Sequence, residues 1–190
     1  MQVITIAGSP RFPSRSTSLL TYSQHILESH GVEVIPWNIQ HFEPDDLIQA
    51  RFDAPAMTLF KEDLASASGI IIATPVYKAS YSGVLKTVLD LLPERALENK
   101  VVLPLATAGS QAHMLAIDYA LKPVLSTLKA RDILQGVFAD DSQVIQDGPQ
   151  ARIADMITGR LNKELETFLQ AIHRLKAPVP KVSVATWSRA

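Results

Sequence analysis

The sequence predicts an α/β domain built on a parallel sheet. Five short runs rich in Val and Ile alternate with helix-length segments, and the runs are apolar at nearly every position, as strands buried on both faces are. Parallel neighbours need a crossover of helix length, and right-handed crossovers distribute helices over both faces. The predicted strands are residues 3–7, 32–37, 69–74, 101–106 and 133–138. The predicted helices are residues 16–29, 55–66, 82–92, 113–130 and 151–174.

Five such strands suit a flavodoxin-like three-layer sandwich, with strand order 2-1-3-4-5 and helices on both faces. The alternative is half of a classical dinucleotide fold, but the GxGxxG motif is absent after the first strand, where the sequence is GSPRFP. In either order, ligands bind beyond the carboxyl ends of the strands. We therefore expect a single domain over residues 1–175, a tail over residues 176–190, and a site formed by the loops after strands one, three and four.

Composition restricts the function classes. The chain has 190 residues, 47% apolar and 19% charged, with a formal net charge of -1, which provides no overall field for nucleic acid or anionic lipid. It has no cysteine, which excludes thiol catalysis, disulfides and cysteine-ligated metals. No histidine or carboxylate spacing indicates a metal site. With no signal peptide and no apolar run of membrane-spanning length, we expect a cytoplasmic protein that binds neither nucleic acid nor membrane.

The loop after the first strand is rich in hydrogen-bond donors. Residues 7–18 read AGSPRFPSRSTS, and a helix is predicted to begin near Ser16. Unpaired amides at a helix start, with hydroxyl and guanidinium groups, are suited to hold a phosphate. The candidate donors are Ser9, Arg11, Ser14, Arg15, Ser16 and Ser18. The alternative is a solvated loop in which Ser14 or Ser16 only caps the helix.

The loop after the third strand, within residues 73–93, is suited to contact a flat ring. Pro75 fixes the chain direction, Tyr77 offers an aromatic face, and Gly83 allows close approach of the backbone. The alternative is an ordinary strand–helix turn with Ser82 as its N-cap.

The loop after the fourth strand reads ATAGSQAH, and Thr107, Gly109 and Ser110 could hydrogen-bond the edge of such a ring. His113 follows this loop and is a possible base near neutral pH. We favour a capping or packing role for it. Farther along, Pro123 lies inside the predicted helix 113–130 and removes a backbone donor, so we expect a kink or a local widening there.

Together the three loops resemble the NAD(P)H-dependent FMN reductases. The stretches GSPRFPSRS and TPVYKASYSGVLKTVLD are similar to that family's elements G-S-x-R-x-x-S-x-N and T-P-x-Y-N-x-S-x-P-G-x-L-K-N-x-x-D, and the resemblance covers about residues 1–145. The stretches KVVLPLAT, DYALKPVLS and GVFADDSQVI also resemble the flavin reductases that serve alkanesulfonate monooxygenases in sulfur-starved bacteria.

The resemblance implies a site residue by residue. Around the FMN phosphate and ribityl chain it places Ser9, Arg11, Ser14, Arg15 and Ser16. Along the isoalloxazine it places Pro75, Val76, Tyr77, Lys78, Ser82 and Gly83, and at the far edge Thr107, Ala108, Gly109 and Ser110. It implies no catalytic side chain, because a hydride passes directly from NADPH or NADH to the flavin while the protein stacks the two rings and excludes water.

The sequence departs from the family pattern in four places: Ser16, Lys78 and Thr87 replace Asn, and Ser82 replaces Pro. An ammonium at Lys78 near the pyrimidine edge would favour the anionic reduced flavin and modulate hydride acceptance. The alternative is a solvated loop lysine.

Tyr119 lies one turn before Pro123. The resemblance implies that this tyrosine belongs to a widened turn at a tetramer interface and is linked to easy exchange of the flavin. It follows that Tyr119→Ala should leave the flavin bound on purification. Without the resemblance, a partly buried core tyrosine is the simpler interpretation. We expect a homo-oligomer, a dimer or a tetramer.

The leading interpretation is therefore an enzyme that reduces free FMN with NADPH or NADH and supplies the reduced flavin to a monooxygenase. One alternative keeps FMN as a fixed prosthetic group that reduces quinones, chromate or azo dyes. Another is a flavodoxin-type electron carrier, although such carriers are usually strongly acidic and this chain is nearly neutral, with Arg11 and Arg15 in the phosphate loop.

Overall fold

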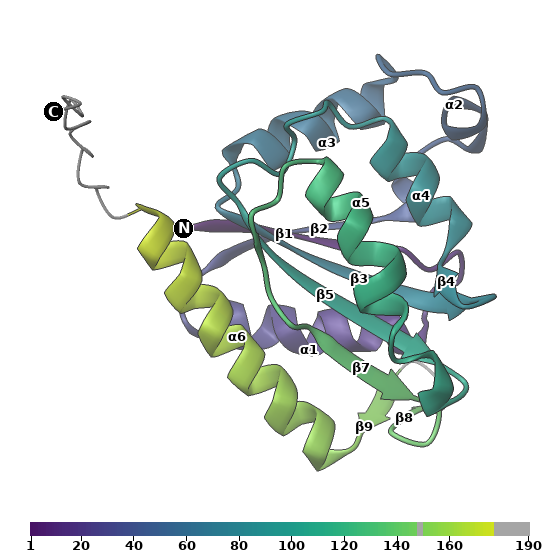
Figure 1. Cartoon of the computed structure of the whole chain (residues 1–190), viewed down its shortest axis with the longest axis vertical. Coiled ribbons are helices and arrows are strands. Elements are labelled where there is room, and N and C mark those ends of the chain that lie inside the picture. Colours follow the sequence, from purple (N-terminus) through teal and green to yellow (C-terminus); the bar gives the residue numbers. More distant parts are fainter. Residues whose placement is uncertain (148–149, 177–190) are drawn as a thin grey trace, which may run out of the picture.

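The computed structural model describes residues 1–147 and 150–176, which form a sheet between two layers of helices (Figure 1). The strands are β1 Gln2–Ala7, β2 Glu33–Asn38, β3 Gly69–Tyr77, β4 Ser80–Tyr81, β5 Val101–Ala108, β6 Asp132–Ile133, β7 Val137–Asp140, β8 Val144–Asp147 and β9 Gln150–Ile153. The α-helices are α1 Arg15–Ser29, α2 Pro44–Ile48, α3 Pro55–Ser66, α4 Gly83–Asp90, α5 Lys122–Thr127 and α6 Asp155–Lys176. Shorter turns are the 3-10 helices η1 Ile39–His41 and η2 Gln111–His113, and the π-helix η3 Ile117–Leu121.

The main sheet confirms the predicted fold class. Its strands follow the order β2-β1-β3-β5-β6, all parallel, with β7 also pairing β5 and the short β4 antiparallel to β3. Ala7 pairs with Ala73, and Pro75 pairs with Thr107. This register brings the loops after β1, β3 and β5 to the same edge of the sheet.

The two largest hydrophobic clusters of the described residues fill the space between the sheet and its helices. Ile4 and Ile6 of β1 pack in a cluster with side chains of α3, α4 and α5, whereas Val3 of the same strand belongs to a cluster with α1 and α6. Side chains of a strand point alternately to its two faces, so each strand contributes to both clusters. This double burial explains why the strands read as continuous apolar runs.

The prediction of one continuous fifth strand over residues 133–138 is wrong. The structure has two short strands there, β6 and β7, with a break between them. Gly136 in the break has φ +87, and a Cβ on it would clash with the carbonyl oxygen of Pro104. The chain therefore turns through a conformation that favours glycine and interrupts the extended backbone.

The segment after β7 also corrects the prediction. Residues 144–150 are predicted to be a connecting loop and residues 151–174 a helix, but β8 and β9 form an antiparallel pair, and α6 begins only at Asp155. The apolar helical stripe of α6 was clear in the sequence. The short strands were not, because the buried Val144 is followed by the exposed Ile145, which breaks the apolar run typical of the other strands.

The predicted helix 113–130 is interrupted. It consists of the end of η2, the π-helix η3 and the short helix α5. The widened turn η3 ends just before Lys122 and Pro123, so the local widening expected at this proline is confirmed. Helix α2, with Pro44 in its first turn, was not predicted.

Within residues 1–147 and 150–176, no helix is long and apolar enough to cross a membrane. The division into a domain over residues 1–175 and a tail stays a prediction, since residues 177–190 lie outside the described part of the chain.

Candidate functional site

A cavity of about 370 Å³ lies at the carboxyl edge of the sheet. It is lined by Ser9, Arg11, Pro13, Ser14, Arg15, Ser16, Pro75, Val76, Tyr77, Thr107, Ala108, Gly109, Asp141 and Gln146. Three loops that are distant in the sequence therefore meet as predicted. Lys78, Ser82, Gly83 and Ser110 are not among the lining residues.

The start of α1 presents hydrogen-bond donors to this cavity. Ser14 is the N-cap in extended conformation: its Oγ accepts from the Thr17 amide at 3.2 Å, and the Ser14 amide donates to Thr17 Oγ1 at 2.7 Å. This reciprocal cap leaves the amides of Arg15 and Ser16 at the open end of the helix, where partial positive charge collects. The first turn contains no acidic residue. The capping role of Ser14 is thus confirmed, and it is compatible with an anion at the helix start, but the loop is not simply solvated, because Ser9 and Ser16 are buried.

The loop before α1 is fixed by its neighbours. The Gly8 amide donates to the Ala73 carbonyl at 2.7 Å, and the Ser82 hydroxyl donates to the Gly8 carbonyl. A Cβ on Gly8 would lie 2.9 Å from a methyl carbon of Leu85. Beyond it, Ser9 is buried and its Oγ accepts from the Arg11 amide at 3.1 Å. The donors of this loop are therefore held in place from β3 and α4.

Arg15 reaches the segment that follows β7. Its Nη1 lies 3.1 Å from Asp141 Oδ1, and its Nε donates to the Val144 carbonyl at 3.1 Å. One turn along α1, the Ser18 hydroxyl donates to Gln146 Oε1 at 3.1 Å. Segment 141–146 thus closes one side of the cavity.

Sequence reasoning missed Pro13, Asp141 and Gln146 as lining residues. The missed signal was topological, because Asp141 follows the last strand of the sheet at the same edge as the other loops. The neighbouring carboxylate Asp140 is engaged elsewhere: it accepts from the Ser142 hydroxyl at 2.6 Å and from the Gln111 amide at 2.6 Å, and these bonds lower its pKa.

The β3 side of the cavity is formed by Pro75, Val76 and Tyr77, and Tyr77 is 46% exposed. Beyond it, Lys78 and Ala79 have φ +50 and +63 and form a two-residue hairpin turn between β3 and β4. Lys78 therefore lies at an exposed hairpin tip. Asparagine tolerates this left-handed region better than lysine does, which gives the family's Asn at this position a structural reason.

The other predicted residues outside the lining have local roles. Ser82 is buried and is the N-cap of α4, where its Oγ accepts from the Leu85 amide at 3.3 Å. A Cβ on Gly83 would meet no described atom within 4 Å, so the surrounding protein does not require glycine there. At the end of β5, Ser110 Oγ accepts from the Ala112 amide at 3.2 Å and caps η2, which ends at His113.

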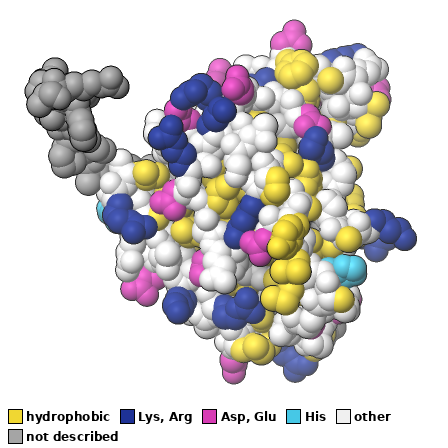
Figure 2. All heavy atoms as spheres, viewed as in Figure 1, with side chains coloured by type: hydrophobic (Ala, Val, Ile, Leu, Met, Phe, Trp, Pro, Cys, Tyr) yellow, Lys and Arg dark blue, Asp and Glu magenta, His cyan; other side chains and the backbone are white. Residues whose placement is uncertain are grey.

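Tyr119 lies in η3 and is 79% exposed, so the interpretation as a partly buried core residue is wrong. The large exposed hydrophobic side chains Met114 and Leu115 precede it. Figure 2 shows hydrophobic side chains gathered in a band on the face that α5 covers. Exposed apolar groups of this kind are typical of an interaction surface.

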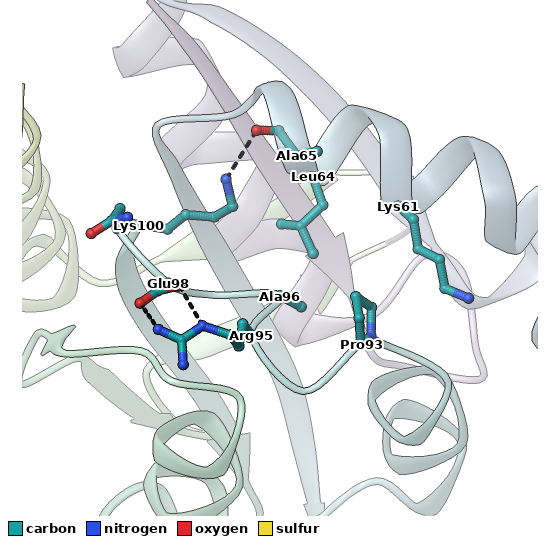
Figure 3. A pocket seen from close by; sticks show the side chains of 9 residues that line it. Lys61, Leu64, Ala65, Pro93, Arg95, Ala96, Glu98 and Lys100 are labelled. Atoms are coloured by element: carbon teal, nitrogen blue, oxygen red, sulfur yellow. Dashed lines mark hydrogen bonds and ion pairs between the residues drawn. The ribbon is translucent and has the colours of Figure 1, made fainter.

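A second cavity, of about 290 Å³, lies at the opposite edge of the sheet, where β3 and β5 begin. Lys61, Arg95 and Lys100 are among its lining residues (Figure 3). Lys100 is only 7% exposed, and its Nζ donates to the carbonyls of Ala65 and Ala67 at 3.3 and 2.8 Å. Burial lowers the pKa of this ammonium. No residue of the predicted site lies in this second cavity.

The fold and the first cavity define a flavodoxin-like α/β protein with a cationic, donor-rich site at the carboxyl edge of its sheet. Residues 1–144 match the family model described as NADPH-dependent FMN reductase, and the chain belongs to this family.

Two curated relatives and one solved structure are similar over most of their lengths. An FMN reductase (NADPH) of Escherichia coli is 62% identical, covering 95% of this chain and 94% of the relative. An FMN reductase (NADPH) of Pseudomonas putida is 54% identical, covering 94% and 92%. The apo crystal structure of an NADH:FMN oxidoreductase is 33% identical, with a TM-score of 0.79 over 90% of this chain and 89% of that one. The chain is accordingly an oxidoreductase that acts on FMN with NAD(P)H, which confirms the predicted enzyme class and cofactors.

Proposed function

We propose that the first cavity, at the carboxyl edge of the sheet, binds FMN as an exchangeable substrate. The protein would reduce this FMN with NAD(P)H and release it to a flavin-dependent monooxygenase. The observation that carries the proposal is the convergence of the three strand-end loops on one cavity that contains Arg11, Arg15 and the start of α1. A cavity of about 370 Å³ is within the range of small-molecule sites.

The donors present fit a flavin phosphate. The amides of Arg15 and Ser16, the Ser9 hydroxyl and the guanidinium groups of Arg11 and Arg15 would hold the phosphate and the ribityl chain. Pro75, Val76 and Tyr77 would lie along the ring, and Thr107, Ala108 and Gly109 would close its far edge. Ser82 and Ser110 would not contact the flavin. They would act indirectly, by fixing the loops that carry the lining residues.

When bound, FMN supplies the atom that accepts the hydride from the nicotinamide. The task of the chain is then to bind and orient. Thr107 is buried near the end of β5, and Thr74 Oγ1 accepts from the Ser82 amide at 3.0 Å, so the walls that would lie beside the ring are anchored to the sheet. Walls anchored in this way would hold two stacked rings at a fixed separation and exclude water from between them.

Reduction of free flavin requires a site that flavin can enter and leave. Tyr77, Arg11 and Arg15 line the cavity and are exposed or partly exposed to solvent, which supports exchange. The alkanesulfonate monooxygenase as recipient rests on the resemblance of the motifs. We further propose that the exposed side chains Met114, Leu115 and Tyr119 form a contact between copies of the chain in a dimer or tetramer.

The test follows NADPH and NADH consumption by the purified protein with and without added FMN. We expect consumption to require added FMN and to saturate with it. We also expect the addition of an alkanesulfonate monooxygenase to couple this consumption to oxidation of an alkanesulfonate. A protein that purifies yellow and consumes NAD(P)H at a rate independent of added FMN would overturn the exchangeable-flavin proposal.

A second candidate is a reductase of azo dyes or quinones with permanently bound FMN. One relative favours it: an NADPH azoreductase of a Bacillus species is 26% identical over 93% of this chain. Under this candidate, steady-state turnover depends on the dye or quinone concentration, and prolonged dialysis does not remove the flavin.

A further inference from the structure

Arg15 has an anionic partner within the protein itself. Its Nη1 lies 3.1 Å from Asp141 Oδ1, and the two side chains are 41% and 43% exposed. Both residues line the cavity proposed for FMN. The charged lining residues are therefore Arg11, Arg15 and Asp141, and the carboxylate cancels half of the positive charge that the two arginines provide.

Asp141 lies between the start of α1 and the end of β5. A Cβ on Gly109 would be 3.8 Å from its second carboxylate oxygen, Oδ2. A phosphate oxygen that accepts from the Arg15 guanidinium would thus share that guanidinium with a carboxylate. Two anions on one guanidinium repel each other, and the repulsion is only partly screened in a half-exposed site.

A carboxylate beside an arginine can have either of two opposite effects on anion binding. It can hold the guanidinium in the orientation that the ligand needs, or it can compete with the ligand for the same N–H groups. In this protein, Arg15 has a neutral orienting contact, because its Nε donates to the Val144 carbonyl at 3.1 Å. Orientation of Arg15 therefore does not require Asp141.

We propose that Asp141 competes with the FMN phosphate for Arg15 and thereby keeps the flavin exchangeable. The inference rests on the proposed function, since it assumes that the phosphate binds at the α1 start. An ion pair as exposed as this one is weak, so FMN displaces it at a moderate cost in affinity. Asp141 would then set how long the flavin stays bound.

The test measures dissociation constants by quenching of flavin fluorescence, for FMN and for riboflavin, which lacks the phosphate. We expect Asp141→Asn to bind FMN about threefold to tenfold more tightly than the wild type at low salt, the size of a half-exposed charge interaction. Dissociation of FMN should slow by a similar factor in stopped-flow exchange. Riboflavin affinity should not change, and the gain for FMN should shrink at high salt.

Two controls separate competition from a general charge effect. Asp45→Asn makes the same charge change on the exposed first turn of α2, outside the cavity lining, and should leave FMN affinity unchanged. In an Arg15→Met background, Asp141→Asn should give a smaller gain than it gives with Arg15 present, since the contested guanidinium is gone.

Each outcome decides between the alternatives. Weaker FMN binding by Asp141→Asn would show that Asp141 positions Arg15, and unchanged binding would show that it has no role, so either result overturns the inference. If Arg11→Ala with Arg15→Met binds FMN as tightly as the wild type does, the proposed phosphate site itself fails, whatever Asp141→Asn does.

Discussion

The two cavities at opposite edges of the sheet are both lined by cationic side chains, but these side chains differ in how strongly the protein itself engages them. At the carboxyl edge, the described structure shows no protein partner for the Arg11 side chain, and Arg15 has only half-exposed contacts. At the other edge the cations are engaged by the protein: Lys100 by the Ala65 and Ala67 carbonyls, and Arg95 by Glu98.

Helix direction explains the difference. In a parallel sheet the connecting helices run opposite to the strands, so helix starts gather at the carboxyl edge and helix ends gather at the amino edge. Helix α1 begins at the first cavity with unpaired amides, and α3 ends at the second with carbonyls that accept from Lys100. A cation beside a helix start adds to an anion site, whereas a cation beside a helix end caps the helix.

The largest expected effect comes from removing both cationic side chains of the first cavity while leaving the second cavity unchanged. Arg11→Ala combined with Arg15→Met should weaken FMN binding by about one hundredfold or more, since each charge-assisted hydrogen bond to phosphate is worth about 1.5 to 3 kcal/mol and the double variant removes two such donors. Lys100→Met should leave FMN affinity within about twofold of the wild type, because it lies at the other edge. Fluorescence titration with FMN measures both. Equal losses in the two variants would contradict the comparison.

The next effect concerns the backbone of the first cavity. Gly8→Ala would place a Cβ 2.9 Å from Leu85 and 3.1 Å from the Ala73 carbonyl, so the loop must move, and we expect a loss of about 2 kcal/mol in the free energy of unfolding. FMN affinity should fall as well.

Gly159→Ala on α6 is the matched control, because a Cβ there meets nothing within 4 Å. It should raise stability by about 0.5 to 1 kcal/mol and leave FMN affinity unchanged. Urea unfolding and FMN titration of both variants provide the test. A stable Gly8→Ala protein with normal FMN affinity would show that the loop tolerates displacement.

The regular strands and helices that form the two edges of the sheet were predicted well from the sequence. Continuous apolar strands and striped helices are determined by burial, so β1, β3 and β5 and helix α3 are found where the pattern places them. Their carboxyl ends then share an edge as a matter of topology, which is why the residues of all three loops meet in one cavity.

What the sequence did not reveal depends on contacts between distant segments. The β8–β9 pair is too short and too exposed to produce a period, so Gln146 could not be assigned to the cavity, whereas the position of Asp141 directly after β7 was a signal that was missed. The hairpin tip at Lys78 depends on left-handed backbone at two non-glycine residues, which no residue preference indicates. The role of Lys100 could not be predicted, because the sequence does not show that the end of α3 lies beside this lysine.

A third prediction uses the pH dependence of the second cavity. Lys100→Met removes the donor to two carbonyls and should cost about 1 kcal/mol near neutral pH. Because burial lowers the pKa of Lys100, the folded state binds fewer protons than the unfolded chain between that lowered pKa and about 10.5. The lysine's contribution to stability therefore grows as pH rises through this window.

The difference in unfolding free energy between the wild type and Lys100→Met should accordingly widen from pH 7 towards pH 10. Urea unfolding of both proteins across this range measures it, and pH effects common to both cancel. A difference that narrows with rising pH would mean that the ammonium is stabilised rather than desolvated at this edge.

The smallest effect concerns the hairpin at the mouth of the first cavity. Lys78 has φ +50, and Asn tolerates this region better, so Lys78→Asn should raise the free energy of unfolding by about 0.5 kcal/mol. Since Lys78 lies outside the cavity lining, FMN affinity and the rate of hydride transfer should stay within about twofold of the wild type. Lys78→Ala, which removes the ammonium without favouring the turn, is the control. A slower hydride transfer in both variants would show that the ammonium reaches the flavin from the hairpin tip, and the first cavity would then extend beyond its lining residues.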